Sequence, residues 1–385
     1  MTWEPHAAAL ADRAAHRHSR WAEPLATTPR HVFVPRWWGR GPDGEWLLRD
    51  GAEDPDSWFR EAYSDTSLVT RVGRLHADDA ADDARPPEGR PTSSATLPSL
   101  LVRMYQHALI DDADTVCDVG TGSGYGTALL ARRLTSRQVV SLDVDPYLVD
   151  AARTRLETVG LTPRVAHADA TGPLPVDPGS VDRLVATVAV GPPIPPSWLD
   201  ALCVGGRLVT VLAGTSLLVT AERTDDGGAL GRVAWDRAGF MPARHGPNHP
   251  PGAGTVLAEA AVGDGEDVSL GPYPVVDVEN AWDLACMVAL KAPGVEHAYR
   301  EDDDGRRTAL MAHPDGSWAR ATAAGDQRPT VHQSGPRRLW DLLDECRAYW
   351  LTHGELPVRG ARVIVRPDGT TVLARGRWHH KVETR

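Results

Sequence analysis

Residues 115–145, TVCDVGTGSGYGTALLARRLTSRQVVSLDVD, decide the fold of this 385-residue chain. The first five are mostly β-branched and apolar, which predicts a buried strand. The strand ends at Gly120, Gly122 and Gly124, where small residues let the backbone turn sharply against a ligand. A helical stretch follows, and a second strand then closes with Asp143. This order predicts a nucleoside ligand at the carboxyl edge of a parallel sheet, with the acid on the ribose hydroxyls.

The residue before the glycines helps to distinguish between cofactors. Sites for NAD, FAD and S-adenosylmethionine all use glycine-rich turns, so the turn alone is a weak signal. Here it follows Asp118, in D-V-G-T-G-S-G-Y. A pyrophosphate needs bare backbone amides and would be repelled by an acid close by. S-adenosylmethionine has no phosphate and carries a cationic amino group and a sulfonium, so Asp118 favours it over a dinucleotide.

The composition excludes several classes of protein. The net charge of -11 and the pI near 5.7 argue against a nucleic-acid surface, which needs a basic footprint. The four cysteines are widely spaced and form no C-x-x-C, so we predict neither a metal site nor a disulfide framework. The N-terminus has no signal-peptide core, and no apolar run is long enough to span a bilayer. We therefore expect a cytoplasmic protein without nucleic-acid or membrane partners, and we expect it to be a monomer.

Strands and helices continue to alternate after Asp143. The predicted elements are helices over 146–159 and 198–202, strands over 164–168, 182–187 and 206–212, and a hairpin of 217–222 and 231–235. Such alternation predicts an α/β fold with a doubly wound, mostly parallel sheet, as in S-adenosylmethionine-dependent methyltransferases. We place this catalytic domain at 1–244.

Two regions fall outside this pattern. Residues 37–90 are rich in Gly, Asp, Trp and Arg and hold an acidic run at 78–83, so we predict an inserted, solvated loop. Residues 245–254 are rich in Pro, Gly, Asn and His and predict a boundary. Beyond it, helical and strand patterns predict a C-terminal α+β module over 255–385. The module contains no set of residues with catalytic or metal-ligand spacing.

Hydroxyl side chains cluster just before a predicted helix that starts near Pro98. They stand in P-T-S-S-A-T-L-P-S-L-L-V-R-M, residues 91–104, and include Ser94 and Thr96. Serine and threonine commonly cap helices, which is one explanation of their place here. A group of hydroxyls next to free helix amides would also hold a carboxylate. The residues alone leave both explanations open.

Several ordered motifs together resemble the protein-L-isoaspartate O-methyltransferase family. They are P-R-H-V-F-V-P, A-Y-S-D, S-S-A-T-L-P-S-L-L-V-R-M, D-V-G-T-G-S-G-Y-G-T-A-L-L-A, V-S-L-D, H-A-D-A and P-P-I-P, in the family's order between about residues 29 and 244. By this resemblance the cofactor is S-adenosyl-L-methionine, and the residues implied to bind it are Asp118, Gly120, Thr121, Gly122, Tyr125, Asp143, Val144, Asp169 and Ala170. The implied catalytic residues are Ser94, Thr96 and Asp65, and no metal is implied.

The chain departs from that family in its long loop at 37–90 and in residues 255–385. As a whole it resembles the long actinobacterial methyltransferases encoded beside ribosomally made modified peptides. The pieces that carry this likeness are R-H-V-F-V-P-R, S-S-A-T-L-P-S, D-G-S-W-A-R and G-P-R-R-L-W-D. The resemblance implies a peptide partner of the graspetide or lanthipeptide kind. One of its aspartates would be esterified, and the ester would collapse to a succinimide that can open to isoaspartate.

Other functions remain open from the sequence. A general isoaspartate repair methyltransferase would use the same cofactor site and accept short isoaspartyl peptides. A small-molecule methyltransferase would accept neither kind of peptide, and a regulator that only binds the cofactor would transfer no methyl group. We expect the 255–385 module to recognise or cover the peptide.

Overall fold

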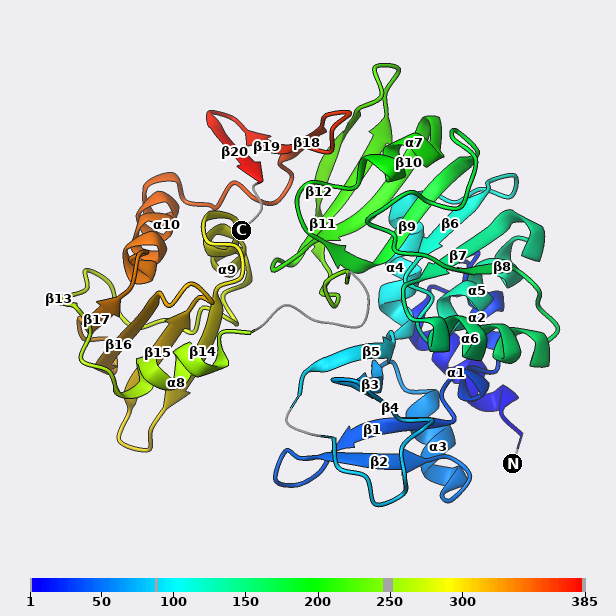
Figure 1. Ribbon diagram of the computed structural model, residues 1–385, viewed down its shortest axis with the longest axis horizontal. Coiled ribbons are helices and arrows are strands. Elements are labelled where there is room, and N and C mark those ends of the chain that lie inside the picture. Colours follow the sequence, from blue (N-terminus) through cyan, green and yellow to red (C-terminus); the bar gives the residue numbers. More distant parts are fainter. Residues whose placement is uncertain (1, 87–88, 245–251, 383–385) are drawn as a thin grey trace.

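The computed structural model describes residues 2–86, 89–244 and 252–382. One ten-stranded sheet and two five-stranded sheets organise these residues. In Figure 1 an N-terminal five-stranded sheet lies below the ten-stranded sheet, and a C-terminal five-stranded sheet lies to its left. None of the helices in the described ranges is long and apolar enough to cross a membrane.

The parallel part of the large sheet contains the predicted strands. In spatial order it runs β10-β9-β6-β7-β8, and every neighbouring pair is parallel. The bounds are β6 Val116–Val119, β7 Val139–Asp143, β8 Arg164–His167, β9 Val181–Val190 and β10 Leu202–Leu212. The chain leaves β6 towards β7 and β8 on one side, and later returns to the other side through β9. This reversal places a switch point between β6 and β9, where such sheets form ligand crevices.

Helices cover both faces of the parallel strands, so the predicted α/β fold with a doubly wound parallel sheet is confirmed. One face packs against α1 Glu4–Ala14, α2 Ala22–Thr27, α4 Pro98–Ala108, α5 Tyr125–Arg133 and α6 Pro146–Thr158. The other face buries Trp198 and Leu199 of α7, Pro196–Ala201. Val116 and Cys117 enter opposite cores because successive strand residues point to opposite faces.

Antiparallel strands extend the sheet beyond β10. They are β11 Leu217–Arg223 and β12 Ala229–Arg237, followed by β18 Arg362–Val365, β19 Thr371–Arg375 and β20 Trp378–Val382. The edge of β12 pairs with β18, which removes an exposed row of backbone groups. The prediction of one separate module over 255–385 is therefore wrong for its last strands, which belong to the catalytic domain's sheet. The predicted boundary at 245–254 lies mostly outside the described residues.

The insertion at 37–90 is a folded sheet rather than the predicted loop. Its elements are β1 Arg36–Arg40, β2 Trp46–Asp50, α3 Pro55–Ala62, β3 Leu68–Val72, β4 Leu75–His76 and β5 Pro91–Ala95. Trp38, Val72 and Ala80 belong to a small core of its own. The acidic run is also more than a solvated surface, because Asp78 accepts a hydrogen bond from the Tyr147 hydroxyl at 2.9 Å and pairs with Arg155.

The C-terminal sheet has helices on both faces. Its strands are β13 Asp267–Leu270, β14 Glu296–Glu301, β15 Arg306–Ala312, β16 Trp318–Ala324 and β17 Thr330–Ser334. Helix α8, Gly254–Val262, packs on one face, and α9 Trp282–Lys291 and α10 Leu339–His353 pack on the other. Arg359 joins this region to the large sheet, because it donates to Asp283 of α9 at 2.9 Å and to the Asp236 carbonyl of β12 at 2.9 Å.

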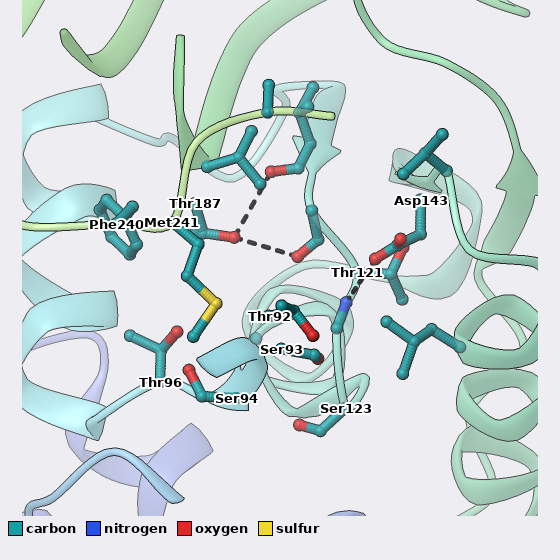
Figure 2. A pocket seen from close by; sticks show the side chains of 18 of the residues that line it. Thr92, Ser93, Ser94, Thr96, Thr121, Ser123, Asp143, Thr187, Phe240 and Met241 are labelled. Atoms are coloured by element: carbon teal, nitrogen blue, oxygen red, sulfur yellow. Dashed lines mark hydrogen bonds between the residues drawn. The ribbon is translucent and has the colours of Figure 1, made fainter. Parts of the chain in front are cut away.

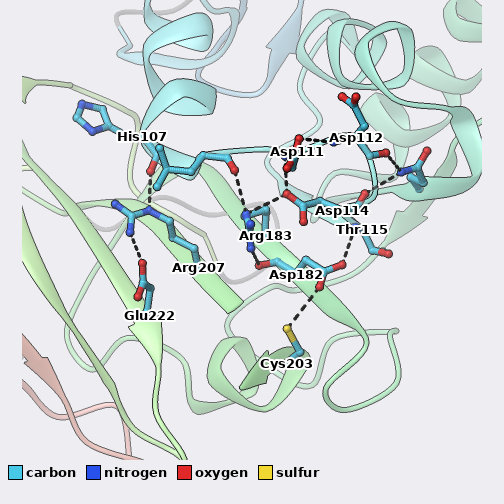
Figure 3. Close-up of polar contacts among 12 residues, drawn as sticks. His107, Asp111, Asp112, Asp114, Thr115, Asp182, Arg183, Cys203, Arg207 and Glu222 are labelled. Carbon is cyan, nitrogen blue, oxygen red and sulfur yellow. Dashed lines mark hydrogen bonds and ion pairs between the residues drawn. The ribbon is translucent and has the colours of Figure 1, made fainter. Parts of the chain in front are cut away.

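A polar network closes the amino edge of the parallel strands (Figure 3). Arg183 of β9 forms an ion pair with Asp114 at 3.1 Å, and Asp182 accepts a hydrogen bond from the Thr115 amide at 2.8 Å. Arg207 of β10 donates to the His107 carbonyl at 2.7 Å and to Glu222 of β11 at 2.6 Å. These contacts fix the start of β6 against β9 and the end of α4 against β10.

Candidate functional site

A pocket of about 300 Å³ opens at the opposite, carboxyl edge of the parallel strands. Its wall comes from β5, from the glycine turn after β6, from the ends of β7 and β9, from the chain after β8, and from residues 239–244. Figure 2 shows hydroxyl side chains on its floor and Asp143 on one side. The pocket therefore forms at the switch point of the sheet, where the sequence predicts a nucleoside ligand.

The glycine turn packs so closely against β9 that a side chain at Gly120 would collide with it. Gly120 has a φ of +100°, and an added Cβ would lie 2.9 Å from Val188 Cγ1 and 3.0 Å from Thr187 Oγ1. Thr187 also donates its hydroxyl to the Gly120 carbonyl at 3.0 Å, which fixes the turn against β9 (Figure 2). Gly122 has a φ of +52° and donates its amide to Asp143. The turn is thus held open for close approach of a ligand to backbone.

Asp118 is a buried acid at the end of β6, 2% exposed, that lines the pocket. Its Oδ2 atom accepts hydrogen bonds from the hydroxyls of Thr127 at 2.7 Å and Ser141 at 2.9 Å. Burial raises the pKa of Asp118 to about 6, and these two hydrogen bonds limit the rise. No cationic side chain among the described residues pairs with it, so its charge is available to a cationic ligand.

Asp143, at the end of β7, is oriented by backbone groups. It accepts the Gly122 amide at 2.9 Å on Oδ2 and the Asp145 amide at 3.0 Å on Oδ1. Burial raises the pKa of Asp143, and the two amides oppose that rise. Its carboxylate lines the pocket in a fixed orientation, with lone pairs left for hydroxyl donors.

Ser94 and Thr96 reach the pocket from β5 and from the turn after it. Within the described part of the chain, neither hydroxyl makes a hydrogen bond. The neighbouring hydroxyls are engaged: Thr92 donates to the Gly73 carbonyl at 2.8 Å, and Ser93 accepts from Thr70 at 3.0 Å. Thr92 and Ser93 also line the pocket, but Ser94 and Thr96 are the hydroxyls of this segment that have no partner in the described chain.

The cap of α4 is a different residue. Position 97, before the helix, is a leucine without a side-chain capping bond, and Asp65 accepts the Ser99 amide at 2.9 Å. The capping explanation of the hydroxyl cluster is therefore wrong for Ser94 and Thr96. The Ser99 amide is also already engaged by Asp65, so it is not free to hold a carboxylate.

Ten of the twelve predicted site residues line the pocket. They are Ser94, Thr96, Asp118, Gly120, Thr121, Gly122, Tyr125, Asp143, Val144 and Ala170. The other two do not line it. Asp65 caps α4 instead of facing the pocket, so we make no catalytic assignment for it. The Asp169 carboxylate accepts the amide of Thr171 at 2.9 Å, and its neighbours Ala170 and Thr171 form the wall there.

Arg30 organises the segment that carries the hydroxyls. Its guanidinium is fully buried and donates to five backbone carbonyls, those of Ala62, Ser64, Thr66, Ala95 and Thr96. Burial lowers the pKa of this guanidinium, with nearby Tyr125, Asp65 and Tyr63 opposing the change. The sequence marks Arg30 only as part of P-R-H-V-F-V-P, and the scattered carbonyls it gathers leave no sequence pattern.

Residues 239–244 form the part of the wall that the sequence does not predict. Pro242 makes a parallel bridge with Ala189 at the end of β9, through bonds from the Ala189 amide to the Met241 carbonyl and from the Ala243 amide to the Ala189 carbonyl. In Figure 2 the Met241 side chain extends into the pocket towards Ser94 and Thr96. Arg244 completes this wall.

The described ranges contain no group of three His, Cys, Asp or Glu side chains that could hold a metal ion. The site instead combines an open glycine turn, two oriented acids and free hydroxyls. Together with the sheet topology, these features define a nucleoside-cofactor enzyme of the α/β methyltransferase class.

Comparisons with known proteins identify the family. The family model described as protein-L-isoaspartate(D-aspartate) O-methyltransferase matches residues 78–242. A protein-L-isoaspartate O-methyltransferase of Koribacter versatilis is 34% identical over 173 residues, which cover 44% of this chain and 75% of that relative. One from Methanoculleus marisnigri is 39% identical over 182 residues, 47% of this chain and 63% of the relative. The chain belongs to the protein-L-isoaspartate O-methyltransferase family.

A solved structure also shares the overall fold. It is a protein-L-isoaspartate O-methyltransferase with a TM-score of 0.50 at 15% identity, and the match covers 99% of both chains. Members of the family are S-adenosylmethionine-dependent carboxyl O-methyltransferases, and this chain is an enzyme of that class. The prediction of the cofactor is thereby confirmed.

Proposed function

We propose that this enzyme methylates the side-chain carboxylate of an aspartate in a ribosomally made, modified peptide. The observation that carries the proposal is the pair of free hydroxyls, Ser94 and Thr96, which line the same pocket as the glycine turn and its acids. A carboxylate is ionised at neutral pH and needs no base, so the pocket need only orient it. Hydroxyl donors suit this task because they orient an anion without neutralising it.

The proposed cofactor residues fit S-adenosylmethionine by their chemistry. When bound, the cofactor would supply an electrophilic methyl group on a sulfonium. Asp118 is a buried carboxylate with only hydroxyl partners, which suits a ligand with a cationic amino end. Asp143 presents an oriented carboxylate to ribose hydroxyls, and Gly120 and Gly122 allow close approach to the backbone. Thr121, Tyr125, Val144 and Ala170 complete the lining, and Asp169 acts by holding Thr171 in the wall.

The proposed catalytic contribution of the chain is alignment. Ser94 and Thr96 would hold one carboxylate oxygen of the peptide in line with the methyl group, which supplies rate by fixing geometry. Arg30 would keep those hydroxyls in place through its bonds to the carbonyls of Ala95 and Thr96. Met241 and Phe240 would help to exclude water from the reacting atoms.

The product explains the proposed biological outcome. In a methyl ester of aspartate, the backbone nitrogen of the following residue can form a bond to the ester carbonyl carbon. The bond to methoxide breaks, and methanol leaves with the amide proton. The resulting succinimide can then be hydrolysed to aspartate or isoaspartate.

The choice of a tailoring role is supported by the parts of the chain outside the family match. Two motifs that carry the likeness to tailoring enzymes, D-G-S-W-A-R and G-P-R-R-L-W-D, are adjacent in the fold. Arg337 of the second motif forms an ion pair with Asp315 of the first at 2.9 Å, and its amide donates to Ser317 at 3.0 Å. The two motifs therefore form one ordered part of the C-terminal region, joined by direct contacts between them.

The second candidate is a general protein-L-isoaspartate repair enzyme. It is favoured by the names of the relatives from Koribacter and Methanoculleus. It is also favoured by the solved family member that matches 99% of both chains, because that match means that added C-terminal structure does not by itself imply tailoring. The two candidates differ in which peptide the enzyme accepts.

Mass spectrometry of candidate peptides incubated with the enzyme and cofactor tests the proposal. We expect a normal aspartate in a modified precursor peptide to gain one CH2 and then lose methanol. Short isoaspartyl peptides serve as the comparison. If only these gain the methyl group, the repair function is correct. If neither kind of peptide is modified, carboxyl methylation of peptides is excluded.

A further inference from the structure

Two buried arginines lie at one side of the pocket, and neither belongs to the proposed cofactor or hydroxyl groups. Arg244 is 9% exposed and lines the pocket, and Arg71 of β3 is 5% exposed behind it. They come from segments far apart in the sequence, one from the inserted sheet and one from the chain after β12. Both guanidiniums approach the carboxylate of Asp145, two residues after the end of β7.

That carboxylate is already well supplied with partners. Its Oδ2 atom lies 3.0 Å from Arg71 Nη1 and 3.2 Å from His76 Nε2, and its Oδ1 atom accepts the Tyr147 amide at 3.1 Å. Arg244 Nη2 is 3.8 Å from the same Oδ2, beyond hydrogen-bond distance. Arg244 is therefore not required to satisfy Asp145.

The guanidinium of Arg244 is left with unused donors. Its buried Nη1 atom has no hydrogen-bond partner among the described residues, and the buried Nε and Nη1 atoms of Arg71 lack aligned acceptors as well. Asp143, the other acid close by, takes two backbone amides rather than a guanidinium. Buried polar groups in folded proteins are almost always hydrogen-bonded, so an unpaired guanidinium facing a pocket indicates a ligand that completes it.

The chemistry of the two guanidiniums indicates what kind of ligand would bind there. Burial, with the nearby charge of Arg244 in addition, lowers the pKa of Arg71, which means that the two guanidiniums repel each other in a desolvated place. Two arginines and His76 surround the carboxylate of Asp145, and Asp143 is a second acid close to the arginines. The unpaired Nη1 donor of Arg244 requires an acceptor, and a carboxylate matches the planar guanidinium fork.

We propose that Arg244, backed by Arg71, forms a carboxylate subsite that binds a second acidic side chain of the peptide, next to the aspartate that is methylated. The proposal rests on the proposed function of peptide carboxyl methylation and adds a preference for acidic sequence around the target. The reacting carboxylate itself belongs at Ser94 and Thr96, because a guanidinium on it would weaken its nucleophilic oxygen.

The cofactor's own carboxylate is the other source of the same chemistry. Its amino-acid end is assigned to Asp118, whose carboxylate accepts from the hydroxyls of Thr127 and Ser141. Arg244 instead lies 3.8 Å from Asp145, whose amide donates to Asp143, on the side assigned to the ribose. The geometry thus favours a peptide carboxylate over the cofactor's.

Calorimetry on the full-length enzyme saturated with S-adenosylhomocysteine tests the subsite. The probes are hexapeptides with one aspartate or isoaspartate and with glutamate placed in turn at each other position, compared with the same peptides carrying glutamine. At one position or more, we expect the wild-type enzyme to bind the glutamate peptide about ten-fold more tightly, as a charge-assisted hydrogen bond implies. Equal binding of every glutamate and glutamine pair by the wild type would overturn the proposal.

Variants locate the preference. Arg244→Gln should abolish the preference for glutamate, and Arg244→Lys should retain part of it through charge alone. Arg232→Gln, which removes an exposed arginine on β12, is the matched control and should leave it unchanged. A preference that survives Arg244→Gln in a folded protein would contradict the assignment.

The affinity for S-adenosylhomocysteine separates the two sources of carboxylate. Arg244→Gln should leave it within about two-fold of the wild type, as expected for a group outside the cofactor site. A ten-fold loss would assign the subsite to the cofactor instead. Methyl transfer is scored separately: if the glutamate preference holds but no peptide is methylated, the proposed function fails while the subsite stands.

Discussion

The two edges of the parallel sheet use the same residue types in opposite ways. At the amino edge, Asp114 is paired with Arg183 and Asp182 accepts the Thr115 amide (Figure 3). At the carboxyl edge, Asp118 has only hydroxyl partners and Asp143 has only backbone amide partners. Figure 2 shows Asp143 at this edge. An acid paired with an arginine, such as Asp114, holds strands together, whereas acids that line the pocket without a cationic partner remain available to a ligand.

The arginines at the two edges also differ in how many of their donors are paired. Arg183 forms an ion pair with Asp114 and donates to the carbonyls of Leu109 and Asp182. Its partners therefore all come from this chain. Arg244 keeps an unpaired buried Nη1 that faces the pocket. Unpaired buried groups also occur away from the pocket, for example in Arg132 and Trp340, so it is the position of the Arg244 donor in the pocket wall that links it to a ligand.

Removing one acid from each edge should give the largest contrast. Asp143→Ala should weaken S-adenosylmethionine binding by about 2–3 kcal/mol, on the order of a hundred-fold in Kd, because charge-assisted bonds to the ribose are lost. Asp182→Ala should leave that affinity unchanged and lower only stability. Calorimetric titration of both variants checks this, and equal affinities for the two would remove the cofactor role of Asp143.

Breaking the ion pair at the amino edge should affect folding alone. Arg183→Met leaves the buried Asp114 carboxylate without its cation, which should cost about 2 kcal/mol of the free energy of unfolding. Denaturant titration measures this loss. Binding of S-adenosylmethionine by the folded variant should equal that of the wild type. A stable variant with weakened cofactor binding would mean that the two edges are coupled.

The free hydroxyls should act on the rate rather than on the cofactor. Ser94→Ala and Thr96→Val should each lower kcat about ten-fold, because each removes one hydrogen bond that orients the carboxylate. Ser93→Ala is the matched control, since its hydroxyl is engaged by Thr70 outside the proposed reaction. Steady-state kinetics with calorimetry of the cofactor distinguishes these effects. Loss of cofactor affinity in the Ser94 or Thr96 variants would contradict the assignment to the substrate.

The smallest effect should be a pH dependence from Asp118. Its pKa of about 6 means that the carboxyl is ionised above pH 6 and neutral below it. A cationic ligand should therefore bind less tightly as the pH falls from 7 to 5, by at most about ten-fold per pH unit. Asp118→Asn should bind weakly with little pH dependence in this range. A wild-type affinity that rises towards pH 5 would exclude the proposed contact.

The sequence predicts the cofactor half of the molecule well, for a local reason. Strand, glycine turn, helix and acid lie within residues 115–145, so the unit that binds the cofactor is contiguous and its periodicity is visible. The pocket lining by Asp118 and Asp143 follows from the ends of adjacent parallel strands. Asp65 illustrates the limit, because an acid in a familiar motif caps α4 rather than facing the pocket.

Features built from distant segments are not predictable in this way. The pairing of β12 with β18 joins strands more than a hundred residues apart, so composition alone suggests a separate module instead. The inserted sheet is hidden by a Gly- and Asp-rich composition, although Trp38 and Val72 form a core there. Arg71 and Arg244 meet only through the fold, and nothing in their neighbouring sequence marks them as a pair.

The most direct test of the account is transfer of a labelled methyl group from S-adenosylmethionine to a peptide carboxylate. We predict that the wild-type enzyme places a base-labile methyl ester on an aspartyl or isoaspartyl peptide, and that Asp143→Ala does not when the cofactor is kept well below its weakened Kd. Asp182→Ala should still transfer the label. A base-stable label, or undiminished transfer by Asp143→Ala at low cofactor, would contradict the claim that the carboxyl edge is the methyl-transfer site.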